Sequence, residues 1–276
     1  MICASCASSR VAQGAAAQYD AIAELYDGYP GNYLDDILFF VEEAKSAGSP
    51  VLEIGIGTGR LALCLAAAGI EVVGIDASPG MLGVLSRKLG RFPHLADRVR
   101  AVAADMRRFA LAARFPLALV PFRTFLYMLT RGDQRSALRA IRRHLLPGGR
   151  VIMAFFVPPP ALIAQGRTER MEMTRFPAPD GGGEVVAYDW TEFGPSQRLV
   201  SHITYEWSPQ RGLPIRQMEH MLTVRYLFPE EVPPLLEECG YRVTSAYGDF
   251  DRGPLTADSH EQIWIAERVE KREGRR

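Results

Sequence analysis

Apolar residues along this chain follow two different spacings, and the change from one to the other divides it into parts. Up to about residue 157, short apolar runs alternate with stretches whose apolar residues recur every three or four positions. The short runs predict buried strands, and the longer stretches predict amphipathic helices that pack on them. The runs are residues 51–54, 71–75, 99–103, 115–120 and 151–157. This alternation predicts an α/β fold with a mostly parallel sheet.

Residues 158–228 break the alternation. Over four stretches, about 168–176, 184–193, 198–207 and 216–226, apolar residues recur at every second position, with Pro and Gly between the stretches. Such spacing predicts an inserted antiparallel sheet. Parity assigns one of its faces to Glu169, Met171, Met173, Val186, Tyr188, Trp190, Ile203, Tyr205, Trp207, Met218, His220, Leu222 and Val224. After the insertion, residues 229–239 predict a helix, 242–247 a sixth strand and 261–267 a last, antiparallel strand.

The turn after the first strand carries a glycine pattern. Residues 53–59 read Glu-Ile-Gly-Ile-Gly-Thr-Gly, and a helical pattern follows at once. Glycines there let a ligand approach the backbone N–H groups at a helix N-terminus. A dinucleotide fingerprint would require its third glycine at position 60, which is Arg60. The spacing therefore argues against a nicotinamide dehydrogenase.

The pattern Glu53-x-Gly55-x-Gly57-x-Gly59 resembles motif I of class I S-adenosylmethionine-dependent methyltransferases, of the type that acts on small molecules. Further segments resemble the same family at residues 18–27, 104–109 and 248–251, and the resemblance covers residues 18–157 and 229–268. It implies a doubly wound, mostly parallel seven-stranded Rossmann-like α/β sheet with the antiparallel sheet inserted over the active site. It also implies the cofactor S-adenosyl-L-methionine, with S-adenosyl-L-homocysteine as product.

Five regions follow from this assignment. Residues 1–17 are expected to be a disordered tail, and residues 18–157 a cofactor-binding core with an N-terminal lid helix. The acceptor-binding sheet occupies residues 158–228. The core then resumes over residues 229–268, and residues 269–276 form a second disordered tail.

Cofactor contacts are expected at the carboxyl ends of the first strands. Asp76 ends the second strand, where an acid can accept hydrogen bonds from both ribose hydroxyls, although it can also serve as a helix cap. By resemblance, Asp105 binds the adenine amino group and Met106 packs on the ring, while Tyr19 belongs to the lid or packs in the core. The full set expected to bind the cofactor is Tyr19, Tyr33, Glu53, Gly55, Gly57, Gly59, Asp76, Ala77, Met81, Asp105, Met106 and Pro121.

The acceptor is expected beneath the inserted sheet, whose aromatic face either forms a pocket or packs on the core. Two residues of that face are candidates for a general base, His220 and Glu169, and each has a purely structural alternative. Side chains expected to contact the acceptor are Tyr26, Arg123, Tyr188, Tyr205 and Trp207. A nitrogen, oxygen or carbon acceptor in secondary metabolism remains open, as do a non-catalytic cofactor-binding protein and a macromolecular acceptor.

Composition argues against several classes of binding partner. The 276 residues carry no formal net charge, so no basic surface indicates nucleic acid as a partner. No apolar run is long enough to span a bilayer, and no secretory signal is visible, so no membrane association is predicted and the cytoplasm is the expected compartment. Cys3 and Cys6 form a C-x-x-C pair without a second pair of ligands, which predicts no metal site. A homodimer is a possible assembly.

Overall fold

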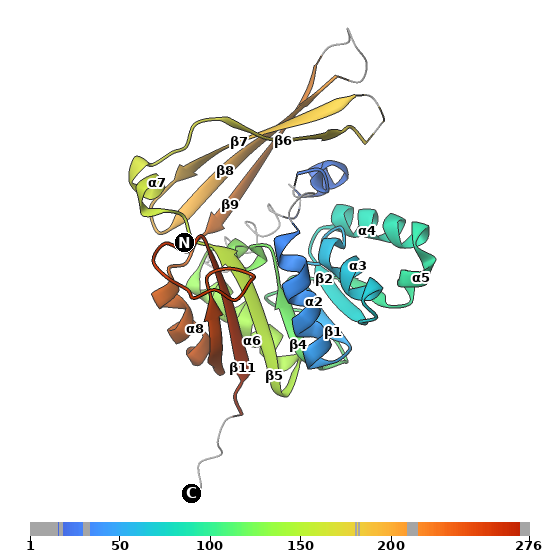
Figure 1. The fold of residues 1–276 in the computed structure, drawn as a ribbon, viewed down its shortest axis with the longest axis vertical. Helices are drawn as coiled ribbons and strands as arrows, with labels where there is room; N and C mark the ends of the chain where they lie inside the picture. Colours follow the sequence, from blue (N-terminus) through green and yellow to red (C-terminus); the bar gives the residue numbers. More distant parts are fainter. Residues whose placement is uncertain are drawn as a thin grey trace, which may run out of the picture.

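The computed structural model describes residue 16 and residues 19–29, 34–179, 181, 183–208 and 215–270. Two sheets form separate layers, with a four-stranded sheet above a seven-stranded one (Figure 1). The tails predicted to be disordered, residues 1–17 and 269–276, lie almost entirely outside the described residues. Within the described part, no helix has the length and apolarity needed to cross a bilayer. The same residues contain no cluster of three or more His, Cys, Asp or Glu side chains suited to a metal ion.

The seven-stranded sheet is the predicted α/β core. In spatial order its strands are β10 (Tyr241–Tyr247), β11 (Glu261–Arg268), β5 (Leu145–Phe156), β4 (Phe115–Val120), β1 (Val51–Ile54), β2 (Val72–Asp76) and β3 (Val99–Ala103). Neighbouring strands from β5 to β3 are parallel, whereas β11 is antiparallel to both of its neighbours, as predicted. The chain leaves β1 in one direction toward β2 and returns on its other side as β4. The carboxyl ends of β1 and β4 therefore form the crevice in which such sheets bind ligands.

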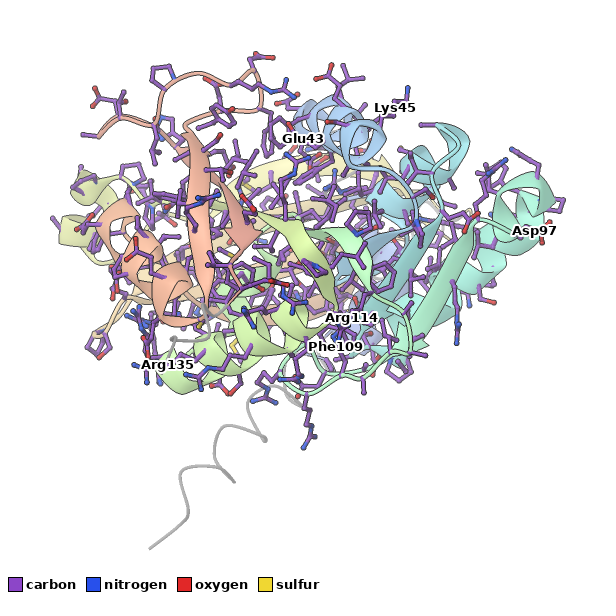
Figure 2. All side chains as sticks on the ribbon, turned by 90° about the horizontal axis from the view of Figure 1, so that it is seen from below. Glu43, Lys45, Asp97, Phe109, Arg114 and Arg135 are labelled. Carbon is purple, nitrogen blue, oxygen red and sulfur yellow. The ribbon has the colours of Figure 1, made fainter. Side chains whose placement is uncertain are left out.

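Helices cover both faces of this sheet. One face carries α2 (Asp35–Ala47), α3 (Arg60–Ala67), α4 (Pro79–Arg91) and α5 (Pro93–Ala96), and the other carries α6 (Arg131–Arg143) and α8 (Val232–Glu238). Seen from below, α2 with Glu43 and Lys45 and α6 with Arg135 lie on opposite sides of the sheet (Figure 2). Shorter elements are η1 (Thr124–Tyr127), α7 (Pro160–Gln165) and η2 (Pro229–Glu231).

Strand β4 shows how one apolar run fills both cores. Leu117 and Leu119 pack with the α2 and α3 side chains, whereas Ala118 and Val120 pack with those of α6. All four are fully buried. A strand covered on both faces needs apolar residues at every position, which is why the run is continuous rather than alternating.

The inserted sheet is antiparallel throughout, in the order β6 (Met171–Pro177), β7 (Glu184–Phe193), β8 (Arg198–Trp207) and β9 (Arg216–Arg225). The limits of β7 and β8 agree with the prediction, and β9 ends one residue earlier. Its inner face packs against the N-terminal segment, where Ile22 and Leu25 contact Val185, Ala187 and Tyr205. Figure 1 shows that segment, in dark blue, beneath the sheet.

The predicted face of this sheet is correct for β8 and β9 and wrong for β7. Tyr205 of β8 lies opposite Ala187, and Ile203 lies opposite Asp189. Residues directly opposite one another share a face, so the inner face of β7 carries Val185, Ala187 and Asp189 rather than Val186, Tyr188 and Trp190.

Strand β6 differs as well. It begins at Met171 rather than at residue 168, and its register shifts between Glu172 and Thr174. Met171 is 61% exposed and Met173 53% exposed, so neither contributes to an inner apolar face. Beyond the shift, Phe176 lies opposite Val185 and does face inward.

Candidate active site

Three glycines shape the turn between β1 and α3. Gly55, Gly57 and Gly59 all have left-handed backbone angles, with φ of 75°, 54° and 84°. A Cβ at Gly55 would approach the Thr124 side chain to 2.5 Å, so the space beside that glycine is already filled. At Gly57, by contrast, the nearest atom is the Met81 Cε at 3.3 Å, and this glycine lines an open cavity. The turn therefore presents bare backbone to that cavity.

Asp76, at the end of β2, is tied to this turn. Its carboxylate accepts the N–H of Gly57 at 2.8 Å and the N–H of Ser78 at 2.9 Å. Burial raises the pKa of Asp76, and these backbone hydrogen bonds partly oppose the shift. A carboxylate has about four lone-pair sites, so capacity remains for two more donors from a ligand. Such a group suits a pair of ribose hydroxyls.

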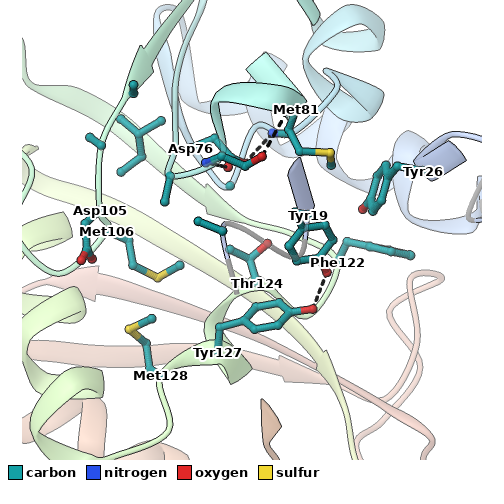
Figure 3. Close-up of a pocket in the computed structure, with 18 of the residues that line it drawn as sticks. Tyr19, Tyr26, Asp76, Met81, Asp105, Met106, Phe122, Thr124, Tyr127 and Met128 are labelled. Atoms are coloured by element: carbon teal, nitrogen blue, oxygen red, sulfur yellow. Dashed lines mark hydrogen bonds between the residues drawn. The ribbon is translucent and has the colours of Figure 1, made fainter. Parts of the chain in front are cut away.

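The opposite end of the cavity holds Asp105, Met106 and Met128 (Figure 3). Arg107 fixes the Asp105 carboxylate through hydrogen bonds from Nε at 3.0 Å and from its terminal nitrogen at 2.6 Å. Burial raises the pKa of Asp105, but the hydrogen bonds from Arg107 outweigh it, and the pKa is lowered overall. The group is thus a charged acceptor beside two thioethers, which suits an exocyclic amine next to a flat ring.

These residues enclose a cavity of about 370 Å³ over the carboxyl ends of the first strands. Eight of the predicted cofactor contacts line it: Tyr19, Gly55, Gly57, Asp76, Ala77, Met81, Asp105 and Met106. Gly59 and Pro121 do not; Phe122, the residue after Pro121, does. Tyr33 lies outside the described residues. The bare glycine surface, the Asp76 carboxylate and the Met106 and Met128 thioethers together fit S-adenosylmethionine.

Glu53 lies under the glycine turn rather than on the cavity wall. Its side chain is 2% exposed, and its Oε2 has no hydrogen-bond partner. Burial raises the pKa of Glu53 to about 8, although Arg60 opposes the shift. Arg60 itself is held by Asp36 through two hydrogen bonds of 2.7 and 2.6 Å. Glu53 is therefore protonated at neutral pH, and a cationic group close to it would lower its pKa.

The N-terminal segment closes the cavity from above. Residues 19–26 are helical, and Asp20 accepts hydrogen bonds from Ser78 Oγ at 2.5 Å and from the Gly80 N–H at 2.7 Å. Asp27 accepts from Thr58 Oγ1 at 2.6 Å and forms a 2.6 Å ion pair with Lys88. Both anchors therefore join this segment to the glycine turn and to α4, which form the floor of the cavity.

A second cavity, of about 320 Å³, lies between this segment, the end of β4 and the inner face of the inserted sheet. Four aromatic residues line both cavities: Tyr19, Tyr26, Phe122 and Tyr127. The hydroxyls of Tyr19 and Tyr127 are hydrogen-bonded to each other at this junction (Figure 3). Burial raises the pKa of Tyr19 and raises that of Tyr127 to about 12, so both phenols are neutral near pH 7.

The junction also contains backbone strain. Phe122 and Arg123, just after β4, adopt left-handed angles with φ of 48° and 68°. Such angles cost energy in residues with a Cβ and occur where the surrounding structure imposes them. Phe122 is stabilised by the Arg60 guanidinium, 4.7 Å from its ring centroid. The strained turn brings the Phe122 side chain to the boundary between the two cavities.

His220 lies on the wall of the second cavity, as the parity of β9 predicts. It is 3% exposed, its ring lies 5.4 Å from that of Tyr19, and its Nε2 has no hydrogen-bond partner. Burial lowers the pKa of His220 to about 4, so the imidazole is neutral at pH 7. It presents a hydrogen-bonding nitrogen next to the junction.

The other predicted acceptor contacts fall into two groups. Tyr26, Arg123 and Tyr205 line the second cavity, and Arg123 is paired with Glu261 at 3.2 Å. Trp207 is partly buried on the inner face of the sheet but packs beside the cavity rather than lining it.

Two predicted placements are wrong. Glu169 is exposed and precedes β6, so it does not share a face with His220. Tyr188 lies on the outer face of β7, where the Arg170 guanidinium stacks 3.7 Å from its ring centroid. The cause of the second error is that the outer phase of β7, with Val186, Tyr188 and Trp190, is more apolar in sequence than the inner phase, with Val185, Ala187 and Asp189.

The same phase error hides Asp189, which lines the second cavity. Tyr29, Thr124, Tyr127 and Met128 also line the cavities and were not singled out by sequence. Tyr127 lies within the segment after β4, which topology alone places beside the ligand. Tyr29 carries no local signal, because its position depends on contacts with a sheet more than a hundred residues away.

Comparison with known proteins shows that the core is similar to methyltransferases. Residues 51–149 match the family model described as a methyltransferase domain. The cypemycin N-terminal methyltransferase of a Streptomyces species is 28% identical over 80% of this chain and 84% of its own length. Among solved structures, the CcbJ methyltransferase from Streptomyces caelestis superposes with a TM-score of 0.71 at 27% identity, covering 88% of this chain and 95% of its own. An S-adenosylmethionine-dependent methyltransferase from Clostridium acetobutylicum shares the fold, with a TM-score of 0.73 at 15% identity over 91% of this chain and 99% of its own.

Proposed function

We propose that this chain, a class I S-adenosylmethionine-dependent methyltransferase, transfers the methyl group to a nitrogen atom of a small molecule bound beneath the inserted sheet, in secondary metabolism. The observation that carries the proposal is the junction of the two cavities. The first cavity fits the cofactor, the second is roomy and largely apolar, and Tyr19, Tyr26, Phe122 and Tyr127 belong to both. A reacting pair at that junction is held close and shielded from water.

When bound, S-adenosylmethionine supplies a sulfonium methyl group that needs an aligned nucleophile rather than further activation. The protein contributes position and surroundings. The phenol rings of Tyr19 and Tyr127 can face the positive charge that moves onto the acceptor nitrogen. Their hydroxyls, neutral at pH 7, can accept hydrogen bonds from its N–H groups.

The ionisable groups at the junction favour nitrogen over oxygen. An alcohol acceptor requires a base strong enough to take its proton, and His220, with its pKa lowered to about 4, is a weak base. A neutral amine already carries a free lone pair, and an apolar cavity lowers the pKa of an ammonium group by desolvation. In this scheme His220 orients the acceptor through Nε2 and is not required to hold a proton between steps.

The relative named above supports the same acceptor atom. Its name describes methylation of a peptide N-terminus, which is an amine, and the similarity extends over most of both chains. A Streptomyces enzyme for a natural product also accords with secondary metabolism. At 28% identity, the relative supports the acceptor's class rather than its identity.

The test is a turnover assay with S-adenosylmethionine carrying an isotope-labelled methyl group. The panel should contain aminosugars and short peptides with free N-termini, each beside its matched alcohol or N-acetyl derivative. We expect label in the amines and none in the blocked partners. Label only in hydroxyl or carbon positions would refute the choice of nitrogen. Tight cofactor binding without transfer to any acceptor would instead indicate a non-catalytic binding protein.

A further inference from the structure

The second cavity contains a carboxylate that has no cationic partner. Asp189 faces inward from β7, and its two oxygens accept hydrogen bonds from Ser201 Oγ at 2.8 Å and from the Tyr29 hydroxyl at 3.2 Å. Both donors are neutral. Among the described residues no ion pair joins Asp189 to a Lys, Arg or His side chain. A carboxylate on an apolar wall is costly unless a counter-charge reaches it.

The remaining charges of this cavity do not supply one. Arg123 is the cation on its wall, and it is paired with Glu261. His220 is neutral. His202, on the neighbouring strand β8, lies on the outer face of the sheet. There its ring centroid is 3.7 Å from that of Trp190, and it contacts Glu192. Among the described lining residues, Asp189 is thus an acid without an ion-pair partner. Burial raises its pKa, and the hydrogen bonds from Ser201 and Tyr29 oppose that shift.

Sheet register fixes where this carboxylate lies relative to the junction. Asp189 is directly opposite Ile203, and Ile203 is directly opposite His220, so the three form one row across β7, β8 and β9. Two interstrand steps separate the Cα atoms of Asp189 and His220 by about 10 Å. His220 contacts Tyr19 at the junction, whereas Asp189 contacts Tyr29. The carboxylate therefore lies on the same sheet face as His220, two strands farther from the point where methyl transfer is proposed.

We propose that Asp189 forms a binding subsite for a second, cationic group of the acceptor, a protonated amine remote from the atom that is methylated. This inference rests on the proposed function, because it requires the acceptor to occupy the second cavity. Ser201 and Tyr29 are positioning residues that hold the carboxylate in place. The cavity then selects acceptors by two points, a nucleophile at the Tyr19–Tyr127 junction and a positive charge at Asp189, farther along the inner face of the inserted sheet.

An independent observation supports an occupant with polar groups at both ends. His220 Nε2 is buried on the same wall without any hydrogen-bond partner, so this cavity holds a second unmatched polar atom. Ile203 lies between the two, and Leu222 lies beside His220 on β9, which suits an apolar stretch of the ligand. The order of groups on the wall is therefore polar, apolar, anionic.

The experiment measures binding rather than turnover. The protein is saturated with S-adenosylhomocysteine and titrated by calorimetry with 1,6-diaminohexane and, as a neutral probe of the same shape, 1,6-hexanediol. Wild type is compared with Asp189→Asn, which keeps the size of the side chain and an acceptor for Tyr29 or Ser201. Glu192→Gln is the matched control, because it removes an acid from the same strand on the outer, exposed face.

We expect the diamine to bind at least tenfold more weakly to Asp189→Asn and within twofold of wild type to Glu192→Gln. Hexanediol binding should change less than threefold in either variant, which separates loss of charge from collapse of the cavity. Asp189→Ser is a second variant and should give the same loss. Diamine affinity within twofold of wild type in Asp189→Asn, or no measurable binding of the diamine to wild type, overturns the inference.

The outcome is distinguishable from failure of the proposed function. Diamine binding that depends on Asp189, combined with transfer of the methyl group only to oxygen, would refute the nitrogen acceptor and retain the subsite. Methylation of amines with no effect of Asp189→Asn on either binding or KM would retain the function and refute the subsite.

Discussion

Asp76→Asn tests the cofactor cavity most directly. In the folded chain the Asp76 carboxylate accepts two backbone N–H groups, from Gly57 at 2.8 Å and from Ser78 at 2.9 Å. Asparagine has nearly the same volume and keeps one carbonyl oxygen, so the turn loses one acceptor and the charge but not its packing. An Asp76→Ala variant would leave both N–H groups unmatched and is the poorer choice, because each costs about 1–3 kcal/mol when buried.

The magnitude follows from the remaining acceptor capacity. Two of about four lone-pair sites are used by the protein, which leaves two for the ribose hydroxyls. The amide nitrogen of asparagine cannot accept, so one hydrogen bond to a charged oxygen is lost, worth about 1.5–3 kcal/mol. That corresponds to a Kd about 10-fold to 150-fold higher.

Calorimetric titration with S-adenosylmethionine and S-adenosylhomocysteine checks this value, and both ligands should lose affinity equally because they share the ribose. Asp97→Asn, the same change at an exposed acid beside α5, is the control and should bind like wild type. A Kd for Asp76→Asn within twofold of wild type, in a variant with native circular dichroism, would refute the assignment of the ribose site.

Three further predictions follow from the same geometry. Gly57→Val should abolish cofactor binding in a calorimetric titration, because the added methyl groups would project into the cavity that the cofactor fills, from a residue with a φ of 54°; detectable binding with native circular dichroism would contradict this. Since burial lowers the pKa of His220 from 6.5 to about 4, the unfolded chain takes up a proton that the folded chain does not as pH falls through that interval, and stability declines there. In urea denaturation, His220→Phe should remove on the order of 2 kcal/mol of the loss between about pH 7 and about pH 4.5, and an unchanged pH dependence would count against the buried neutral imidazole. Glu169→Gln and Tyr188→Ala should leave the kcat and KM of the acceptor within twofold of wild type, because one residue is exposed and the other lies on the outer face; a tenfold loss in either would place the acceptor elsewhere.

The cofactor cavity could be predicted from sequence because its determinants are local. The glycine turn follows β1, Asp76 ends β2 and Asp105 comes two residues after β3, and in a parallel sheet all such ends meet at one edge. Each residue could therefore be placed from its distance to the end of a strand, without knowledge of tertiary contacts. Glu53 is an exception, because it was expected to contact the cofactor but is buried under the glycine turn. Sequence alone does not distinguish an acid exposed at a strand end from one buried under the turn.

The acceptor cavity could be predicted only in outline. The limits of β7 and β8 follow from turn residues, but the face of β7 depends on its register with β8. Its outer phase, with Tyr188 and Trp190, is the more apolar of the two in sequence, so the pattern favours the wrong face. A shift of one residue exchanged Tyr188 for Asp189. In β6, the register shifts between Glu172 and Thr174. Side chains no longer alternate between the two faces across such a bulge, so the face of a residue cannot be assigned from its position in the sequence.

The N-terminal segment has a kinetic consequence. Asp20 and Asp27 fasten it to α4 and the glycine turn, Tyr29 fastens it to Asp189, and Tyr19 forms part of both cavity walls. One stretch of eleven residues, 19–29, thus covers both the cofactor cavity and the acceptor cavity. Any displacement large enough to release the spent cofactor also breaks the wall around the acceptor. We therefore expect exchange at the two sites to be coupled through this stretch, so that a chemical step faster than its opening would leave the opening as the limit on turnover.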